Sequence, residues 1–361
     1  MPSRPTLFDV AARAGVSRST ASRALTGNGY VAADVRQRVR AAADALGYVP
    51  DANARSLKAR RTPTVGLLVS DLRNPFYAEV AAGAGSVLRE RGYTIVLVDD
   101  AGRDAEEVAA ARTFLAMRVA GVLLTPVSAT ATRLIGRHGV PVIEVDRQFC
   151  PGECDAVLID NVGAARELTR HLLALGHTRT TLIVDETTWT TGAGRLQGYR
   201  EALTEAGLPA GDDAVLSCGF DPDEIADRTR GLLAGPRPPT AIFAVNNQVA
   251  EVAWRQAMDL GVSIPHDLSF AAFDDAAWMS MVRPGITTVA QPGFELGARA
   301  ARLLLERLGE RAGGEEVEPA PPRTALLASP LVRRGSTCPV HRPARATEPA
   351  PGRVTSLGSR A

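Results

Sequence analysis

TLFDVAARAGVSRSTASRAL, residues 6–25, has the pattern of two short helices joined by a tight turn. Thr6 is placed to cap the first helix, and Asp9 lies in its first turn, where a carboxylate favours the positive helix end. Gly15 breaks this helix because glycine tolerates a left-handed turn, and Ser17 follows as the N-cap of the second helix. The stretch therefore predicts a helix-turn-helix.

The outward face of the second helix carries side chains suited to nucleic acid. Arg18, Ser19, Ser22 and Arg23 would point away from the small apolar inner face, within reach of base edges and phosphates. The alternative is a helical hairpin inside a larger core, which the basic outer face disfavours. We therefore expect a DNA-binding head.

Positive charge is concentrated at the N-terminus. The whole chain has a net charge of +1, yet residues 1–61 hold 11 Lys or Arg against 4 Asp, leaving 30 against 36 for the remainder. A basic head on an acidic body is typical of nucleic-acid-binding proteins, since the acidic body limits indiscriminate adhesion to DNA. A solvated basic face is the alternative interpretation of this charge.

A third helix and a basic linker follow. VAADVRQRVRAAADALGY, residues 31–48, repeats apolar residues at helical spacing and predicts a helix that covers the first two. PDANARSLKARR, residues 50–61, predicts a hinge helix of about two turns, too short to persist alone in water. Its Leu57 would be buried by a DNA minor groove or, alternatively, by the following domain.

From residue 64 onward, short apolar runs alternate with helical stretches. Continuous apolar runs fit strands that are buried on both faces of a parallel sheet, so we expect an α/β core with two similar lobes. The runs are VGLLVS (65–70), YTIVLVDD (93–100), GVLLTP (121–126), VPVIEVD (140–146), AVLID (156–160), TTLIV (180–184), AVLSC (214–218), TAIFAV (240–245), LSFAAFD (268–274), ITTVAQ (286–291) and TALLASPLVRR (324–334).

The expected fold class is an N-terminal all-α helix-turn-helix head plus an α/β core of two parallel-sheet lobes. The tail has little apolar content, which predicts disorder. The expected domains are the head at 1–49, a hinge helix and linker at 50–62, an N-subdomain at 63–160 with 291–320, a C-subdomain at 161–290 with 321–337, and a disordered tail at 338–361.

Ligands of open α/β sheets bind outside the carboxyl ends of the strands, so strand-end residues of both lobes should meet in a cleft between them. Aromatic rings beside carboxylates, amides and guanidinium groups suit a polyol, and a purine is the alternative ligand. Each strand-end Asp taken alone is as often a simple helix cap. The candidate residues are Phe76, Tyr77, Asp146, Arg147, Trp189, Thr191, Arg195, Phe220, Asn246, Asn247 and Asp274.

Several other function classes lack sequence support. G-x-S-x-G, H-E-x-x-H and Walker A motifs are absent, so no enzyme, cofactor or catalytic residue is expected. Four scattered cysteines include a single C-x3-C pair without a neighbouring histidine, which predicts reduced structural thiols and no metal site. With neither an apolar signal core nor a membrane span, we expect a cytoplasmic protein with no membrane partner.

Residues 5–337 resemble the LacI/GalR family of bacterial transcription regulators. The head and hinge carry the resemblance, and further landmarks continue it along the chain. These are NPFYAEV (74–80), VDR (145–147), IDNVGAARELTRHLLALGHTR (159–179), GAGRLQGY (192–199), IPHDLSFAAFDD (264–275), ITTVAQP (286–292) and LVRRGST (331–337). The resemblance implies a periplasmic-binding-protein-like core and a homodimer that reads a pseudo-palindromic operator in double-stranded DNA.

The resemblance also implies roles for individual residues. In the core, Phe76, Asp146, Arg195, Phe220, Asn246 and Asp274 match effector-contacting positions. Asn247 replaces a common Asp, and Trp189 is unusual at its place. The implied DNA contacts are Arg18, Ser19 and Arg23 as major-groove readers, Thr6, Ser17, Thr20 and Ser22 as phosphate or base contacts, Leu57 as a minor-groove wedge, and Asn53, Ala54 and Lys58 beside it.

We therefore expect a sequence-specific transcriptional repressor that is controlled by a small-molecule effector, a sugar by the chemistry of the cleft. The alternative is a solute-binding protein without DNA function, which would need an export signal and no basic head. The sequence leaves open the effector's identity, whether it induces or co-represses, the operator and regulated genes, and any assembly beyond a dimer.

Overall fold

The computed structural model describes residues 5–27, 29–49, 62–312 and 320–340, and for residues 310–312 it describes the backbone alone. The chain divides into two compact units. The first unit comprises residues 1–63 with 117–120. The second comprises residues 64–116 with 121–361 and contains both lobes of the core.

The head consists of helices α1 (Leu7–Ala14), α2 (Arg18–Thr26) and α3 (Ala33–Leu46). Thr6 and Asp9 form a reciprocal capping box: the Thr6 hydroxyl accepts from the Asp9 backbone N–H, and the Asp9 carboxylate accepts from the Thr6 N–H at 2.8 Å. Gly15 ends α1 with a left-handed φ of 65°, and the Ser17 hydroxyl caps α2. The predicted helix-turn-helix is confirmed.

Small side chains let the three head helices approach closely. Val10, Ala21 and Val39 are fully buried at their centre, one from each helix, and Ala24 is almost fully buried beside them. The resulting core is compact, and α2 keeps its remaining face for solvent or a partner.

The first lobe is a six-stranded parallel sheet in the order β11-β5-β4-β3-β1-β2. The strands are β1 (Thr64–Val69), β2 (Thr94–Asp99), β3 (Gly121–Leu124), β4 (Val142–Val145), β5 (Asp155–Ile159) and β11 (Thr324–Leu327). The helices are α5 (Pro75–Glu90), α6 (Asp104–Ala116), α7 (Ala129–Arg137) and α13 (Gly293–Ala312). As predicted from their apolar runs, β3 and β4 are buried along their whole length, whereas β2 and β11 are partly exposed because they form the two edges of the sheet.

The second lobe repeats this plan in the order β12-β10-β9-β8-β6-β7, parallel except for the antiparallel pair β10 and β12. The strands are β6 (Thr180–Val184), β7 (Val215–Ser217), β8 (Ala241–Ala244), β9 (Ser269–Phe273), β10 (Thr287–Val289) and β12 (Leu331–Val332). The helices are α8 (Asn161–Ala174), α9 (Thr190–Glu205), η1 (Asp212–Ala214), α10 (Pro222–Ala234), α11 (Asn247–Asp259) and α12 (Ala277–Met281). The expected core of two α/β lobes is confirmed.

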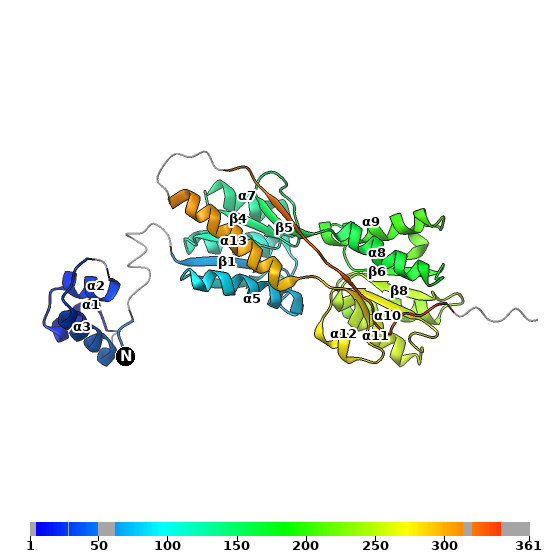
Figure 1. Ribbon diagram of the computed structural model, residues 1–361, viewed down its shortest axis with the longest axis horizontal. Coiled ribbons are helices and arrows are strands. Elements are labelled where there is room, and N and C mark those ends of the chain that lie inside the picture. The colour runs from blue at the N-terminus through cyan, green and yellow to red at the C-terminus, as the bar shows by residue number, and fades with distance from the viewer. Residues whose placement is uncertain (1–4, 28, 50–61, 313–319, 341–361) are drawn as a thin grey trace, which may run out of the picture. The chain divides into compact units, whose positions relative to one another are not determined.

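The final strands correct the expected division of the core. β11 pairs with β5 of the first sheet, whereas residues 321–337 were all expected in the second lobe. Only β12 joins the second sheet, so the chain crosses between the lobes at residues 328–330 (Figure 1). β11 and β12 read as one apolar run in sequence because periodicity says nothing about which edge a strand joins.

The first residues of the expected disordered tail are also placed. The Val340 N–H donates to the Leu175 carbonyl at 2.9 Å, and the Cys338 carbonyl accepts from His177 Nε2 at 2.9 Å. Cys338 also donates through its N–H to the Ser269 hydroxyl at 3.1 Å. Residues 338–340 therefore extend the second lobe, and residues 341–361 lie outside the described part of the chain.

Helices α5 and α13 run side by side in the first lobe at backbone contact (Figure 1). A Cβ at Gly83 of α5 would lie 1.8 Å from the Phe294 carbonyl oxygen, and one at Gly297 of α13 would lie 1.9 Å from the Val80 carbonyl oxygen. Only glycine permits this approach. The packing fixes the N-terminus of α5, where several cleft residues lie.

Candidate functional site

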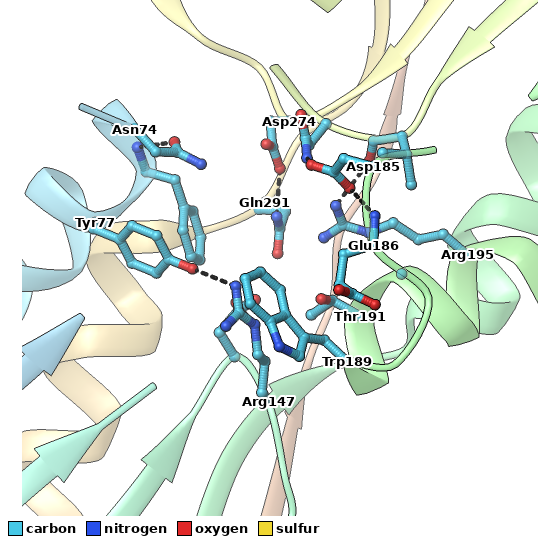
Figure 2. Close-up of a pocket in the computed structure, with 15 residues that line it drawn as sticks. Asn74, Tyr77, Arg147, Asp185, Glu186, Trp189, Thr191, Arg195, Asp274 and Gln291 are labelled. Carbon is cyan, nitrogen blue, oxygen red and sulfur yellow. Dashed lines mark hydrogen bonds and ion pairs between the residues drawn. The ribbon is translucent and has the colours of Figure 1, made fainter. Parts of the chain in front are cut away.

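A cavity between the two lobes is lined by residues that follow the strands of both sheets (Figure 2). We call it the inner chamber. Its lining residues are Asn74, Phe76, Tyr77, Asp146, Arg147, Asp185, Glu186, Trp189, Thr191, Gly192, Arg195, Val245, Asn246, Asp274 and Gln291. In each sheet the chain reverses its direction of winding between β1 and β3 or between β6 and β8, which is where ligands of such sheets bind.

Two aspartates occupy matching positions at the ends of central strands. Asp146 follows β4 and Asp274 follows β9, and each has a left-handed φ of 68°. This conformation is uncommon for a side chain other than glycine, and such strain gathers at functional sites. Both carboxylates are buried and belong to the inner chamber. The two lobes thus present equivalent acidic groups to one cavity.

The two aspartates differ in their hydrogen bonds. Asp274 Oδ2 accepts from the Asn247 N–H at 3.1 Å and from Asn247 Nδ2 at 2.8 Å, and its Oδ1 accepts from the Gln291 amide. Asp146 Oδ1 is buried with no partner among the described residues. Burial raises the pKa of Asp146, and the nearby guanidinium groups of Arg147 and Arg195 oppose that rise. Asp146 therefore has a free acceptor for a ligand.

Arg195 is held rigidly from behind. Its Nε donates to Asn161 Oδ1 at 2.9 Å, and its Nη1 donates to the Val245 carbonyl at 2.8 Å. The guanidinium carbon also lies 3.8 Å from the centre of the Phe273 ring. Nη2 has no acceptor among the described residues, so Arg195 presents a preorganised donor near the cavity.

Arg147 of the first lobe stacks on Trp189 of the second lobe, with its guanidinium carbon 3.7 Å from the indole centre (Figure 2). Nη1 donates to the Ser70 hydroxyl and Nη2 to the Tyr77 hydroxyl, both at 2.9 Å. Trp189 packs in turn on Phe220, with ring centres 4.9 Å apart. This interlobe stack forms one wall of the inner chamber.

Hydrogen bonds also join the lobes directly. Asn247 Nδ2 donates to Asn74 Oδ1 at 2.9 Å, and Gln248 Nε2 donates to Asp71 Oδ2 at 2.7 Å. With these hydrogen bonds formed, the inner chamber has a volume of about 50 Å³, which is room for about four water molecules. In this arrangement a larger molecule enters only if the lobes separate.

An outer chamber of about 460 Å³ adjoins the inner chamber. Asn74, Tyr77, Arg147, Asp185, Trp189 and Asn246 line both chambers, so the interlobe stack lies between them. The outer chamber is completed by residues of both lobes, among them Asp71, Gly102, Phe220, Gln248, Arg255 and Trp278. Its size falls within the range of small-molecule sites.

The structure brings all eleven strand-end candidates to these chambers. Phe220 and Asn247 lie on the outer chamber alone, and the other nine line the inner chamber. Sequence reasoning missed Asn74, Asp185, Glu186 and Gln291. Asp185 and Gln291 follow β6 and β10, so the strand-end rule, applied to these two strands as well, would have identified them. Asn74 was hidden because it reads as the N-cap of α5, a role that it also has.

Asp185 is the most closely paired of the missed residues. Its Oδ2 accepts from Asn246 Nδ2 at 2.6 Å, while Asn246 Oδ1 caps α11 by accepting from the Val249 N–H at 2.9 Å. Burial raises the pKa of Asp185, which the Asn246 hydrogen bond partly offsets. The pair therefore fixes the amide of Asn246 at the edge of the cavity.

The head presents a second candidate surface on α2. Arg18, Ser19 and Arg23 are exposed, as expected for residues that read DNA. The Ser17 hydroxyl lies 2.9 Å from that of Ser19 and 2.8 Å from that of Thr20, so these groups are held together at the start of the helix. The remaining predicted DNA contacts lie as follows: Thr6 caps α1, Ser22 is half-buried on α2, and Asn53, Ala54, Leu57 and Lys58 lie outside the described residues.

Other kinds of site find no support in the described ranges. No group of His, Cys, Asp and Glu there has an arrangement suited to a metal ion, and no helix among those residues is long and apolar enough to cross a membrane. All four cysteines are free thiols, and burial raises the pKa of Cys150 to about 11. That thiol is therefore protonated and a poor nucleophile at neutral pH.

Comparisons with known proteins agree with both units. Residues 6–51 match the family described as bacterial regulatory proteins, lacI family, and residues 62–320 match periplasmic binding proteins and sugar binding domain of LacI family. The chain is 36% identical over 341 residues to the HTH-type transcriptional regulator CelR of Thermobifida fusca, covering 91% of this chain and 98% of that protein.

Two solved structures extend the comparison. A complex of the transcriptional regulator CelR with cellobiose has 32% identity and a TM-score of 0.68, covering 92% of this chain and all of that chain. The lac repressor dimer bound to operator and the anti-inducer ONPF has 25% identity and a TM-score of 0.79, covering 93% of this chain and all of that one. Both the head and the two-lobed core thus have counterparts of known structure.

Proposed function

This chain belongs to the LacI family of DNA-binding bacterial regulators, and on that premise we propose that it is a repressor controlled by a sugar bound between its core lobes. The observation that carries the proposal is the convergence of Asp146, Arg195 and Asp274 in one interlobe cavity. Carboxylate and guanidinium groups form strong hydrogen bonds with hydroxyls, and nearby aromatic rings cover the C–H faces of a sugar.

The effector site proposed on this basis comprises all eleven predicted cleft residues. Asp146 supplies an acceptor without a partner, and Arg195 supplies a preorganised donor. The cellobiose complex of CelR supports a saccharide over a purine, because that regulator has a similar two-lobed core. The named relatives are transcriptional regulators, which supports a binding role for the cavity rather than catalysis.

At the head, we propose that Arg18, Ser19 and Arg23 read bases in the major groove, while Thr6, Ser17, Thr20 and Ser22 position the helix on the backbone. The exposure of the first three supports this role. Two heads in a homodimer would read the two halves of a pseudo-palindrome, as the solved lac repressor dimer on its operator suggests. Such a protein would act in the cytoplasm.

For the segment between the units, we propose that Leu57 is a wedge in the minor groove, with Asn53, Ala54 and Lys58 as its neighbours. Binding of a sugar that prefers one lobe arrangement would then alter operator affinity through this segment, as linkage requires. Leu57→Ala should weaken specific binding more than non-specific binding and reduce DNA bending. A variant that bends the operator as strongly as the original in a circular-permutation gel assay would refute the wedge.

The test of the whole proposal uses the full chain and does not require the operator to be known. Binding sites are first selected from a random DNA library, and affinity for the selected site is then measured by fluorescence anisotropy with and without each of a panel of saccharides and nucleobases. We expect a pseudo-palindromic site and a saccharide that changes its affinity. Sequence-independent binding, or a response to nucleobases alone, would overturn the proposal.

A further inference from the structure

We infer that the effector contains two linked sugar rings, one in the inner chamber and one in the outer chamber. This inference rests on the proposed sugar effector and narrows it to a disaccharide or a longer saccharide. The juxtaposition that carries it is the Arg147–Trp189 stack, which lies between a small polar chamber and a larger chamber with aromatic walls.

The inner chamber is built for the hydroxyls of one ring. Asp146 Oδ1 and Gln291 Oε1 are buried acceptors that lack a hydrogen-bond partner among the described residues, and Arg147 Nε also lacks a hydrogen bond there, although it lies 3.9 Å from Asp146 Oδ2 as an ion pair. Leaving such groups unpaired is costly, and both acceptors and donors are present. A polyol supplies donors and acceptors on neighbouring carbons, so a single sugar ring can satisfy all three atoms once the lobes separate enough to admit it.

The outer chamber offers a different chemistry. Trp189 and Phe220 pack against each other on one side, and Trp278 supplies a third aromatic wall. Phe220 is 48% exposed, although it is a large apolar side chain. Aromatic faces of this kind bind the C–H face of a sugar ring. Polar groups at the rim, including Arg255 and Asp71, can bind its outward hydroxyls.

The dimensions of the two chambers favour two rings over one. The volume of about 460 Å³ in the outer chamber far exceeds the 50 Å³ of the inner chamber, and the two share six lining residues. A monosaccharide held by Asp146 and Arg195 would leave the outer chamber and its aromatic wall unused. A second ring joined through a glycosidic bond would pass Trp189 and cover Phe220.

The test compares each monosaccharide with disaccharides that contain it. Isothermal titration calorimetry of the full chain is carried out with glucose, cellobiose and maltose, with xylose and xylobiose, and with galactose and lactose. We expect at least one disaccharide to bind about tenfold or more tightly than its own monosaccharide. A monosaccharide that binds as tightly as every disaccharide containing it would overturn this inference but leave the sugar proposal intact.

Two single-residue variants test whether the second ring binds in the outer chamber. Phe220→Ala should weaken binding of the best disaccharide by about fivefold to tenfold, and binding of its monosaccharide by a smaller factor. Phe294→Ala is the matched control because Phe294 is 47% exposed and lines neither chamber. Equal affinities for the disaccharide in Phe220→Ala and the original chain would refute the assignment. Failure of every saccharide to bind would overturn both this inference and the sugar effector.

Discussion

Replacing Asp146 by Asn tests the proposed effector site at one atom. The substitution keeps the shape of the side chain, so packing around β4 is preserved, but it removes the negative charge and turns one acceptor into a donor. Asp146 Oδ1 lacks a partner among the described residues, and a sugar hydroxyl is proposed to donate to it. A hydrogen bond to a charged group contributes about 1.5–3 kcal/mol. Loss of this bond should therefore weaken sugar binding by about 10-fold to 150-fold.

The same substitution should not destabilise the protein measured without sugar. Burial raises the pKa of Asp146 despite two neighbouring guanidinium groups, so the folded state favours the neutral carboxyl relative to the unfolded state. A neutral amide should thus leave the thermal midpoint at pH 7 unchanged or higher. This result separates a binding defect from a folding defect.

Calorimetry with the best saccharide from the screen provides the assay, and Asp259→Asn is the matched control. Asp259 is exposed at the end of α11 and lines neither chamber. Its variant should bind the sugar like the original chain. If Asp146→Asn also binds within twofold of the original, Asp146 does not contact the effector and the proposed geometry is wrong.

Three further predictions concern the head, pH and helix packing. Arg18→Ala and Arg23→Ala should each weaken the free energy of binding to the selected operator by about 1–3 kcal/mol, because each arginine is proposed to read a guanine. Fluorescence anisotropy that shows an equal loss of affinity on all DNA sequences would show that these arginines contact only phosphates. Burial raises the pKa of Glu107 to about 7, so its contribution to stability falls as pH rises from about 4.5 to 7, by at most about 3 kcal/mol. Glu107→Gln should reduce this dependence of the unfolding free energy on pH, as measured by urea unfolding. An unchanged pH dependence would contradict the raised pKa of Glu107. Gly297→Ala should lower the free energy of unfolding by about 1–3 kcal/mol, because its Cβ would overlap a carbonyl of α5; Gly309→Ala on the same helix, with no atom near its Cβ, should not, and equal effects would refute the packing argument.

The helix caps and the turn of the head could be predicted residue by residue because the sequence signals for them are local. Thr6, Asp9 and Gly15 act on neighbouring turns of one short helix, so their cap and turn do not depend on the rest of the fold. The lobes were predictable for a similar reason, since each buried strand is a continuous apolar run. Local pattern was sufficient wherever the interaction partners are neighbours in the chain.

The remaining features depend on partners that are distant in sequence. The sheet joined by β11 is decided by its neighbour β5, which lies far earlier in the chain, and no periodicity encodes that choice. The strand-end rule placed Arg147 and Trp189 in the cleft, but their stacking is set by how the two lobes approach. Gln291 was missed because β10 is only three residues long and its end coincides with a crossing between lobes.

The contacts between the lobes also govern how fast a sugar can bind. Asn247–Asn74, Gln248–Asp71 and Arg147–Trp189 must separate before a ring reaches Asp146. At about 1 kcal/mol for each contact, only about one molecule in 150 would be open at a given moment. The apparent affinity falls by that same factor, and the observed association rate should level off at high sugar concentration, where lobe opening becomes limiting.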